Sequence, residues 1–341
     1  MSQPSQPCPS AATTSSPHAD EPDPETAAFL PRLQAMLDAP HPLDRIDPLA
    51  AARAKASAVF AAFAGPPADE GSFVTHDEAA PGPAGAIPIR IYRPLTATAA
   101  PAPLVVFFHG GGWSFGGLDD YDGLLSVLAA LSGAAIASVG YRLAPEHPFP
   151  AGLDDARAAT SYLARRAEAY GCDPRRLGLM GDSAGGNLAA VIALEARTSA
   201  GPPVAAQFLL YPMLDVSRPH AAYPSRLRYG AGAHFLTCES VEASAAAYLR
   251  DPSLGADPRV SPMNAPDLSG APPAYILAPA CDPLRDEAEA YARRLEAAGV
   301  PVRFDCVPGA IHGFLSFGAL AGARAARRAL AHEIRQLLVP A

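Results

Sequence analysis

A serine between two glycines is the strongest sign of chemistry in this chain of 341 residues. Residues 181–185 read GDSAG, directly after a short apolar strand pattern and directly before a helical one. Such a strand-to-helix turn exposes the hydroxyl of the serine, and the flanking glycines avoid clashes in the turn. The same Gly-x-Ser-x-Gly pattern recurs at residues 112–116, but Ser114 has aromatic neighbours and no helix directly after it. We therefore predict Ser183 as the nucleophile of an acyl-transfer site.

A run of glycines lies upstream of this serine. Residues 109–112 read His-Gly-Gly-Gly and directly follow a continuous apolar run at 104–108. Consecutive glycines let backbone N–H groups approach an oxygen closely, and together with the N–H of Ala184 they would form an oxyanion hole. A tight turn that needs positive φ is the alternative interpretation of the glycines taken alone.

A serine nucleophile needs a base that takes its proton and an acid that orients the base. Asp282 and His312 each follow a predicted strand, and the chain order serine, acid, histidine is typical of a sheet with this nucleophile turn. Asp286 and Glu287 are alternatives to Asp282, but they fall where the next helix begins, and acids there usually complement the helix dipole. The alternative histidines lie in the glycine loop, in a proline-flanked turn and in the last helix (His109, His147, His332).

These residues require a sheet that brings distant loops together, and the hydrophobic pattern supplies one. Apolar runs bounded by Pro and Gly alternate with stretches of helical period, which predicts βαβ units and a mainly parallel α/β sheet. Strands are predicted at 73–74, 87–92, 104–108, 134–139, 177–180, 208–211, 275–277 and 302–307. Helices are predicted at 124–131, 151–170, 187–196, 286–298 and 319–338.

Two segments do not fit this alternation and suggest a lid. Residues 27–70 show two helical patterns, and residues 216–250 contain a helix candidate at 241–249 without a strand. We predict that both cover one edge of the sheet, while residues 71–215 and 251–341 form the core. Residues 1–26 are rich in Ser, Pro, Ala and Thr and are predicted to be a disordered tail.

Composition narrows the function classes. The net charge of −8 argues against a nucleic-acid partner. Five scattered cysteines and dispersed histidines predict neither a disulfide framework nor a metal site, and we expect no cofactor. No signal-peptide pattern and no apolar run long enough for a membrane span are present, so we predict a cytoplasmic protein without stable membrane insertion. An edge strand could pair across a homodimer, and the sequence leaves the oligomeric state open.

The motifs resemble those of the bacterial hormone-sensitive-lipase-like esterases, the branch with GDSAG, within the α/β-hydrolases. Four motifs stand in the right order, and a fifth looks like the turn between glycine loop and nucleophile: HGGGW at 109–113, GDSAGG at 181–186, DPLRDE at 282–287, HGF at 312–314 and YRLAPEHPFP at 141–150. The resemblance implies a mostly parallel eight-stranded sheet flanked by helices, with a helical cap. It also implies that the substrates are small molecules, short- to medium-chain carboxylic esters, which are hydrolysed through an acyl-enzyme.

The resemblance also implies roles for single residues. Ser183 would be the nucleophile, His312 the base and Asp282 the orienting acid. The N–H groups of three residues would form the oxyanion hole, with Gly110 adjacent (Gly111, Gly112, Ala184). Trp113 and Tyr211 are candidates to line the substrate pocket, although aromatic residues near a sheet edge are also typical of the core.

Other functions on the same scaffold stay open at this stage. An amidase or a lyase would use the same oxyanion hole and triad, because these serve any acyl carbonyl. A non-catalytic receptor for a small ligand is a further alternative. The plant gibberellin receptor resembles this family but lacks the catalytic histidine, so the presence of His312 favours an enzyme.

Overall fold

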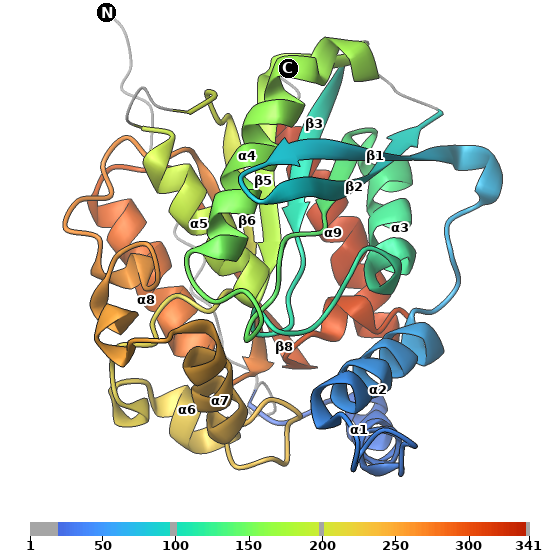
Figure 1. The fold of residues 1–341 in the computed structure, drawn as a ribbon, viewed down its shortest axis with the longest axis vertical. Helices are drawn as coiled ribbons and strands as arrows, with labels where there is room; N and C mark the ends of the chain where they lie inside the picture. Colours follow the sequence, from blue (N-terminus) through green and yellow to red (C-terminus); the bar gives the residue numbers. More distant parts are fainter. Residues whose placement is uncertain (1–19, 96–100, 198–200, 339–341) are drawn as a thin grey trace, which may run out of the picture.

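The apolar runs of the sequence form the strands of one eight-stranded sheet (Figure 1). The computed structural model describes residues 20–95, 101–197 and 201–338. The strands are β1 (Phe73–Gly82), β2 (Gly85–Pro94), β3 (Ala102–Phe108), β4 (Ala135–Val139), β5 (Cys172–Asp182), β6 (Ala206–Leu210), β7 (Ala274–Cys281) and β8 (Val302–Ile311). Their order is β1-β2-β4-β3-β5-β6-β7-β8, and every neighbouring pair from β4 to β8 is parallel. β2 is antiparallel to both β1 and β4, so the predicted mostly parallel eight-stranded sheet is confirmed.

Helices cover both faces of the sheet, which explains why the central strands are apolar throughout. All seven residues of β3 are buried. Leu104 and Phe108 point to the cluster that includes α4 (Ala151–Arg166), α5 (Ala184–Glu195) and α8 (Arg285–Ala297). Val105 and Phe107 point to the opposite cluster, with α3 (Asp122–Ser132) and α9 (Ala321–Leu338). Full burial of each such side chain contributes about 1.5–3 kcal/mol.

The helices of residues 216–250, which we call the insert, differ from the prediction. A short helix that the sequence pattern did not indicate, α6 (Pro224–Tyr229), precedes α7 (Cys238–Tyr248). α7 begins at Cys238 rather than at residue 241, because Thr237 and Ser240 form a capping box that closes its first turn.

Two other helix boundaries also moved. The α-helical part of the stretch predicted at 151–170 ends at Arg166, and a 3₁₀ turn follows it. α5 begins at Ala184 rather than at residue 187, because two glycines in its first turn hide the helical period.

The last residues of the predicted disordered tail, residues 24–26, belong to a helix. Residues 1–19 of the predicted tail lie outside the described residues, but α1 (Pro24–Asp38) begins inside it. Asp23 accepts a hydrogen bond from the backbone N–H of Thr26 (2.8 Å), and Pro24 occupies the first turn, where its missing N–H costs nothing. A loop leads from α1 to α2 (Pro48–Phe63).

The helices α1, α2, α6 and α7 lie together at one end of the molecule, where β8 also ends (Figure 1). The N–H of Asp23, just before α1, donates to the carbonyl of Gly309 near the end of β8 (3.1 Å). The loops that follow the carboxyl ends of the parallel strands lie at the same edge of the sheet as the end of β8. Within the residues that the structure describes, no helix combines the length and apolar character needed to cross a membrane.

Candidate active site

Ser183 lies in a strained turn between β5 and α5. Its φ is 52° and its ψ is −118°, a region that residues with a side chain rarely adopt. Both glycines of the motif are required by packing. A Cβ at Gly181 would lie 2.2 Å from the carbonyl oxygen of Gly185, and one at Gly185 would lie 1.9 Å from that of Phe108. The motif therefore fixes the serine at the carboxyl end of β5.

A hydrogen-bonded chain joins the three residues that the sequence predicted as a triad. Asp282 directly follows β7, and His312 directly follows β8. Nδ1 of His312 lies 2.8 Å from Oδ2 of Asp282, and Nε2 of His312 lies 2.9 Å from Oγ of Ser183. The structure therefore brings together residues 129 positions apart in the geometry of an activated serine nucleophile.

The three hydrogen-bonded side chains are shielded from solvent and fixed by further contacts. Asp282 is 0% exposed, His312 5% and Ser183 6%. The other carboxylate oxygen of Asp282 accepts the backbone N–H of Leu284 (2.8 Å), which fixes the carboxylate toward the histidine. The ring of Tyr211 packs edge-on against the imidazole, with 5.0 Å between ring centroids.

The alternative acids bind the insert instead of His312. Asp286 accepts the backbone N–H of Ser225 in α6 (2.7 Å). Glu287 accepts the backbone N–H of Leu214 (2.7 Å) and pairs with the buried Arg226. Both acids begin α8 as predicted, but they also tie the insert to the core, which the sequence alone did not indicate.

The other candidate histidines and Ser114 do not take part in the hydrogen bonds that join Asp282, His312 and Ser183. His109 is buried in the glycine loop, its ring stacked on Tyr141 at 4.3 Å, and burial lowers the pKa of His109 to about 4. His147 and His332 are exposed. The hydroxyl of Ser114 is buried and has no hydrogen-bond partner within the described residues.

The glycine loop carries backbone N–H groups without a partner among the described residues and contacts Asp182, the residue before Ser183. Gly111 and Gly112 have φ of 106° and 57°, a region that favours glycine. Within the described residues, the N–H groups of Gly111, Gly112 and Ala184 donate to no hydrogen bond, as an oxyanion hole requires. The N–H of Gly110 is already used, because it donates to Asp182 and to the hydroxyl of Tyr121.

Asp182 holds this loop and was missed as a functional residue. Its Oδ1 accepts the N–H of Gly110 (2.7 Å), and its Oδ2 accepts the hydroxyl of Tyr121 (3.1 Å). Asp182 is 3% exposed, and burial raises its pKa to about 6, while these hydrogen bonds limit the rise. The acid next to the nucleophile in GDSAG was the available signal, but its partner lies 72 residues away.

The two aromatic residues predicted to contact substrate lie in the core. Trp113 is 1% exposed, and its ring stacks on Tyr248 of α7 at 4.2 Å. Tyr211 is 0% exposed and packs on His312. These contacts give both rings a packing role, and contact with substrate stays a prediction.

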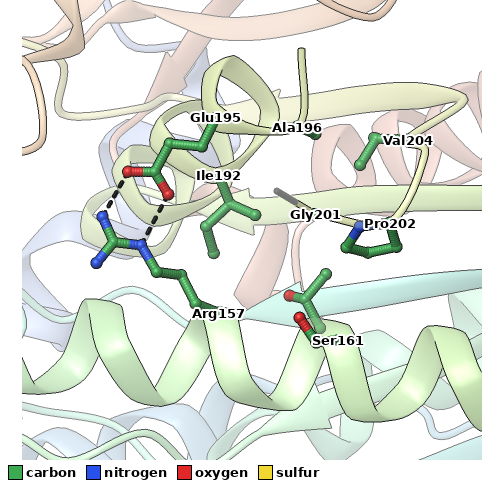
Figure 2. Close-up of a pocket in the computed structure, with 9 residues that line it drawn as sticks. Arg157, Ser161, Ile192, Glu195, Ala196, Gly201, Pro202 and Val204 are labelled. Atoms are coloured by element: carbon green, nitrogen blue, oxygen red, sulfur yellow. Dashed lines mark hydrogen bonds and ion pairs between the residues drawn. The ribbon is translucent and has the colours of Figure 1, made fainter. Parts of the chain in front are cut away.

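A separate cavity of about 340 Å³ lies between α4, α5 and the segment before β6 (Figure 2). Its lining includes the ion pair of Arg157 with Glu195 and the apolar Ile192 and Val204. Glu195 ends α5, so it lies roughly 18 Å along the helix axis from Ser183. This cavity contains none of the predicted site residues.

Comparisons with known proteins agree with this fold and site. A family model described as the α/β-hydrolase fold matches residues 105–316. The carboxylic ester hydrolase LipN of Mycobacterium tuberculosis is 43% identical over 286 residues, which cover 82% of this chain and 74% of that protein. The ethyl acetate hydrolase of Pseudomonas putida is 40% identical over 238 residues, which cover 69% of this chain and 73% of that protein.

A solved structure shows the same architecture. The ester-hydrolase EH1AB1 from the metagenome of Lake Arreo, complexed with a derivative of bipyridine phosphonate, matches with a TM-score of 0.85 and 35% identity. The match covers 92% of this chain and 98% of that one. Because the family model spans more than half of the chain and these relatives align over most of it, the chain belongs to the hormone-sensitive-lipase-like esterases of the α/β-hydrolase family.

Proposed function

We propose that this protein is a serine esterase that hydrolyses short- to medium-chain carboxylic esters through an acyl-enzyme. The observation that carries the proposal is the hydrogen-bonded chain from Asp282 through His312 to Ser183, with distances of 2.8 and 2.9 Å. Membership of a family whose named relatives hydrolyse carboxylic esters and ethyl acetate supports the same reaction. The helices α1, α2, α6 and α7 form its cap.

The mechanism follows from the order of these contacts, with His312 between Ser183 and Asp282. Ser183 attacks the ester carbonyl while Nε2 of His312 takes the serine proton, and Asp282 holds the imidazole in the required tautomer. The carbonyl oxygen gains negative charge and is bound by the free N–H groups of the glycine loop and of Ala184. His312 then gives its proton to the leaving alcohol. A water activated by the same histidine hydrolyses the acyl-enzyme.

Replacing the nucleophile tests this mechanism. We expect Ser183→Ala to lower kcat by about 10⁴ to 10⁶, because the triad acts as a unit. Ser114→Ala is the matched control, since Ser114 stands in the second Gly-x-Ser-x-Gly pattern, and its activity should stay near that of the wild type. Without the nucleophile, only substrate binding and the oxyanion hole still contribute to catalysis. Activity of purified Ser183→Ala within about 100-fold of the wild type would therefore contradict the proposal.

A substrate panel separates ester hydrolysis from the other chemistries of this scaffold. The panel consists of p-nitrophenyl acetate, butyrate, octanoate and laurate, together with the p-nitroanilide of butyric acid. We expect turnover of the shorter esters and little turnover of the anilide. A higher kcat/KM for the anilide than for the matched butyrate ester would identify an amidase. Turnover of no ester would leave the receptor as the supported function.

The cellular location, the partners and the oligomeric state of the enzyme are proposed mainly from the sequence. We expect a cytoplasmic protein, and the four described cysteines, all free, fit a reducing compartment (Cys172, Cys238, Cys281, Cys306). The net charge of −8 argues against a nucleic-acid partner. Within the described residues β8 pairs only with β7, and Asp23 donates to the carbonyl of Gly309, so we propose the part of β8 before Gly309 as the contact of a homodimer. Light scattering of the purified chain tests the dimer.

A further inference from the structure

The insert contacts two loops of the proposed site, the glycine loop and the turn after His312. On one side, Ser244 of α7 lies against the glycine loop, because a Cβ at Gly112 would lie 2.3 Å from its Oγ. On the other side, the ring of Phe235 lies against the turn after His312, because a Cβ at Gly313 would lie 3.6 Å from its Cε1.

The chemistry of acyl transfer assigns a part of the ester to each side. The carbonyl oxygen must face the free N–H groups of the glycine loop, beside Ser244. The histidine that took the serine proton returns it to the leaving oxygen, so the alcohol portion must lie on the side of His312. Phe235, which contacts the residue after His312, therefore stands beside the alcohol portion rather than beside the acyl chain.

A largely apolar groove continues beyond Phe235. It lies between α1 and the loop that joins α6 to α7, and its volume is about 360 Å³. Residues of α1 and of the loop line it, among them Leu30, Pro31, Gln34, Gly232, Ala233 and Phe235. The ring of Phe235 is thus a wall shared by the groove and the turn that carries His312.

Phe235 is held firmly in this position. Its φ of 78° is in the left-handed region, which a bulky residue adopts only when its surroundings require it. An isolated bridge between Ala231 and Thr237 closes the loop that carries it. Its ring packs edge-on against Phe317, with 5.9 Å between centroids. The wall is therefore built into the fold and is not a freely rotating surface side chain.

We propose that Phe235 limits the length of the alcohol portion of the ester, and that the groove beyond it is a latent subsite for longer alcohols. The inference rests on the proposed esterase function and names its substrate class, esters of short alcohols. Removing the ring joins the groove to the active site. The acyl portion lies elsewhere and keeps its own length preference.

Two matched ester series test this assignment. One series varies the alcohol, as ethyl, butyl, hexyl and octyl acetate, and the other varies the acid, as ethyl acetate, butyrate, hexanoate and octanoate. For Phe235→Ala we expect the kcat/KM ratio of octyl to ethyl acetate to rise by about tenfold or more, because each buried methylene adds up to about fourfold. The ratio of ethyl octanoate to ethyl acetate should change little.

Further variants exclude a general loosening of the cap. Leu30→Trp, made in the Phe235→Ala background, fills the groove from its other wall and should remove the gain. Phe304→Ala removes a half-buried ring from the start of β8, which packs against a different core cluster from Phe235, and should leave both series unchanged. If Phe235→Ala does not fold, Phe235→Leu carries the same test with a smaller rise.

The outcomes separate this inference from the function on which it rests. A gain confined to the alcohol series supports it. A gain in the acid series, an equal gain in both, or no change in either overturns it while leaving the esterase function intact. If the wild-type enzyme hydrolyses neither series, the proposed function itself fails.

Discussion

Asp182→Asn should make the protein more stable at alkaline pH and a slower enzyme. In the folded state Asp182 is buried, accepts hydrogen bonds from Gly110 and Tyr121, and has a pKa raised to about 6. Asparagine keeps the shape of the side chain and is neutral at every pH. The substitution therefore separates the cost of burying a charge from the benefit of that charge to the glycine loop.

The stability effect follows from the raised pKa. A carboxyl whose pKa is higher in the folded state contributes stability that is fully present below the unfolded pKa and is lost as the pH rises through the folded pKa. The rise from 3.8 to about 6, at 1.36 kcal/mol per unit, corresponds to about 3 kcal/mol. At pH 8 we expect the free energy of unfolding of Asp182→Asn to exceed that of the wild type by up to about 3 kcal/mol. At pH 4 we expect a difference of less than about 1 kcal/mol.

The activity should change in the opposite direction. A hydrogen bond to a charged acceptor exceeds a neutral one by about 1–2 kcal/mol. If the carboxylate holds Gly110 so that the next two N–H groups meet the oxyanion, kcat falls by about 5- to 30-fold. KM should change little, because the loop acts mainly on the transition state.

Urea unfolding at pH 4 and pH 8, together with kcat for p-nitrophenyl butyrate at pH 8, measures both effects. Asp257→Asn is the control, because the hydrogen bond from Arg259 lowers the pKa of Asp257. That carboxylate stabilises the fold above its unfolded pKa, so its neutralisation should lower stability at pH 8 and leave kcat unchanged. An Asp182→Asn protein less stable than the wild type at pH 8, or one with unchanged kcat, would refute the reasoning.

Two further substitutions test the loops around the site. Gly112→Ala should lower kcat by about tenfold or more, because it strains a left-handed residue and moves an oxyanion donor, and it clashes with Ser244. Gly322→Ala, with nothing near its Cβ, should keep full activity in the same assay, and equal activity of the two variants would contradict the assignment. Arg327→Met removes a buried arginine that donates to three backbone carbonyls, one just after the His312 turn, and should lower the free energy of unfolding by about 1–3 kcal/mol. Urea unfolding checks this against the exposed Arg328→Met, and equal stability of both variants would count against it.

Much of the core was predictable because burial on two faces leaves a simple pattern. β3 is covered by helices on both sides, so its seven residues are continuously buried and read as an apolar run. The short run at residues 177–180 likewise located β5, although the strand extends from Cys172 to Asp182, where polar residues hide the pattern. Ser183 and Asp282 could be placed because each follows such a strand, whereas His312 follows the partly exposed edge strand β8 and was placed with the help of the chain order serine, acid, histidine.

The insert was harder to predict, because its helices are short and one of them is fixed by a local polar contact. α6 has only six residues and lacks a full amphipathic repeat. The start of α7 depends on the capping box of Thr237 and Ser240, which lies before its apolar residues. Periodicity locates the middle of a long amphipathic helix much better than its ends.

The sequence by itself determined the residue types and chain order of a serine hydrolase, because the nucleophile turn requires glycines within a few residues of the serine. Only the tertiary structure decided which distant residues support that chemistry. Asp182 meets Gly110 across 72 residues, and Phe235 meets the turn after His312. Such pairs share no period or spacing along the chain. Their contact arises from sheet order and loop path, which depend on the packing of the whole fold.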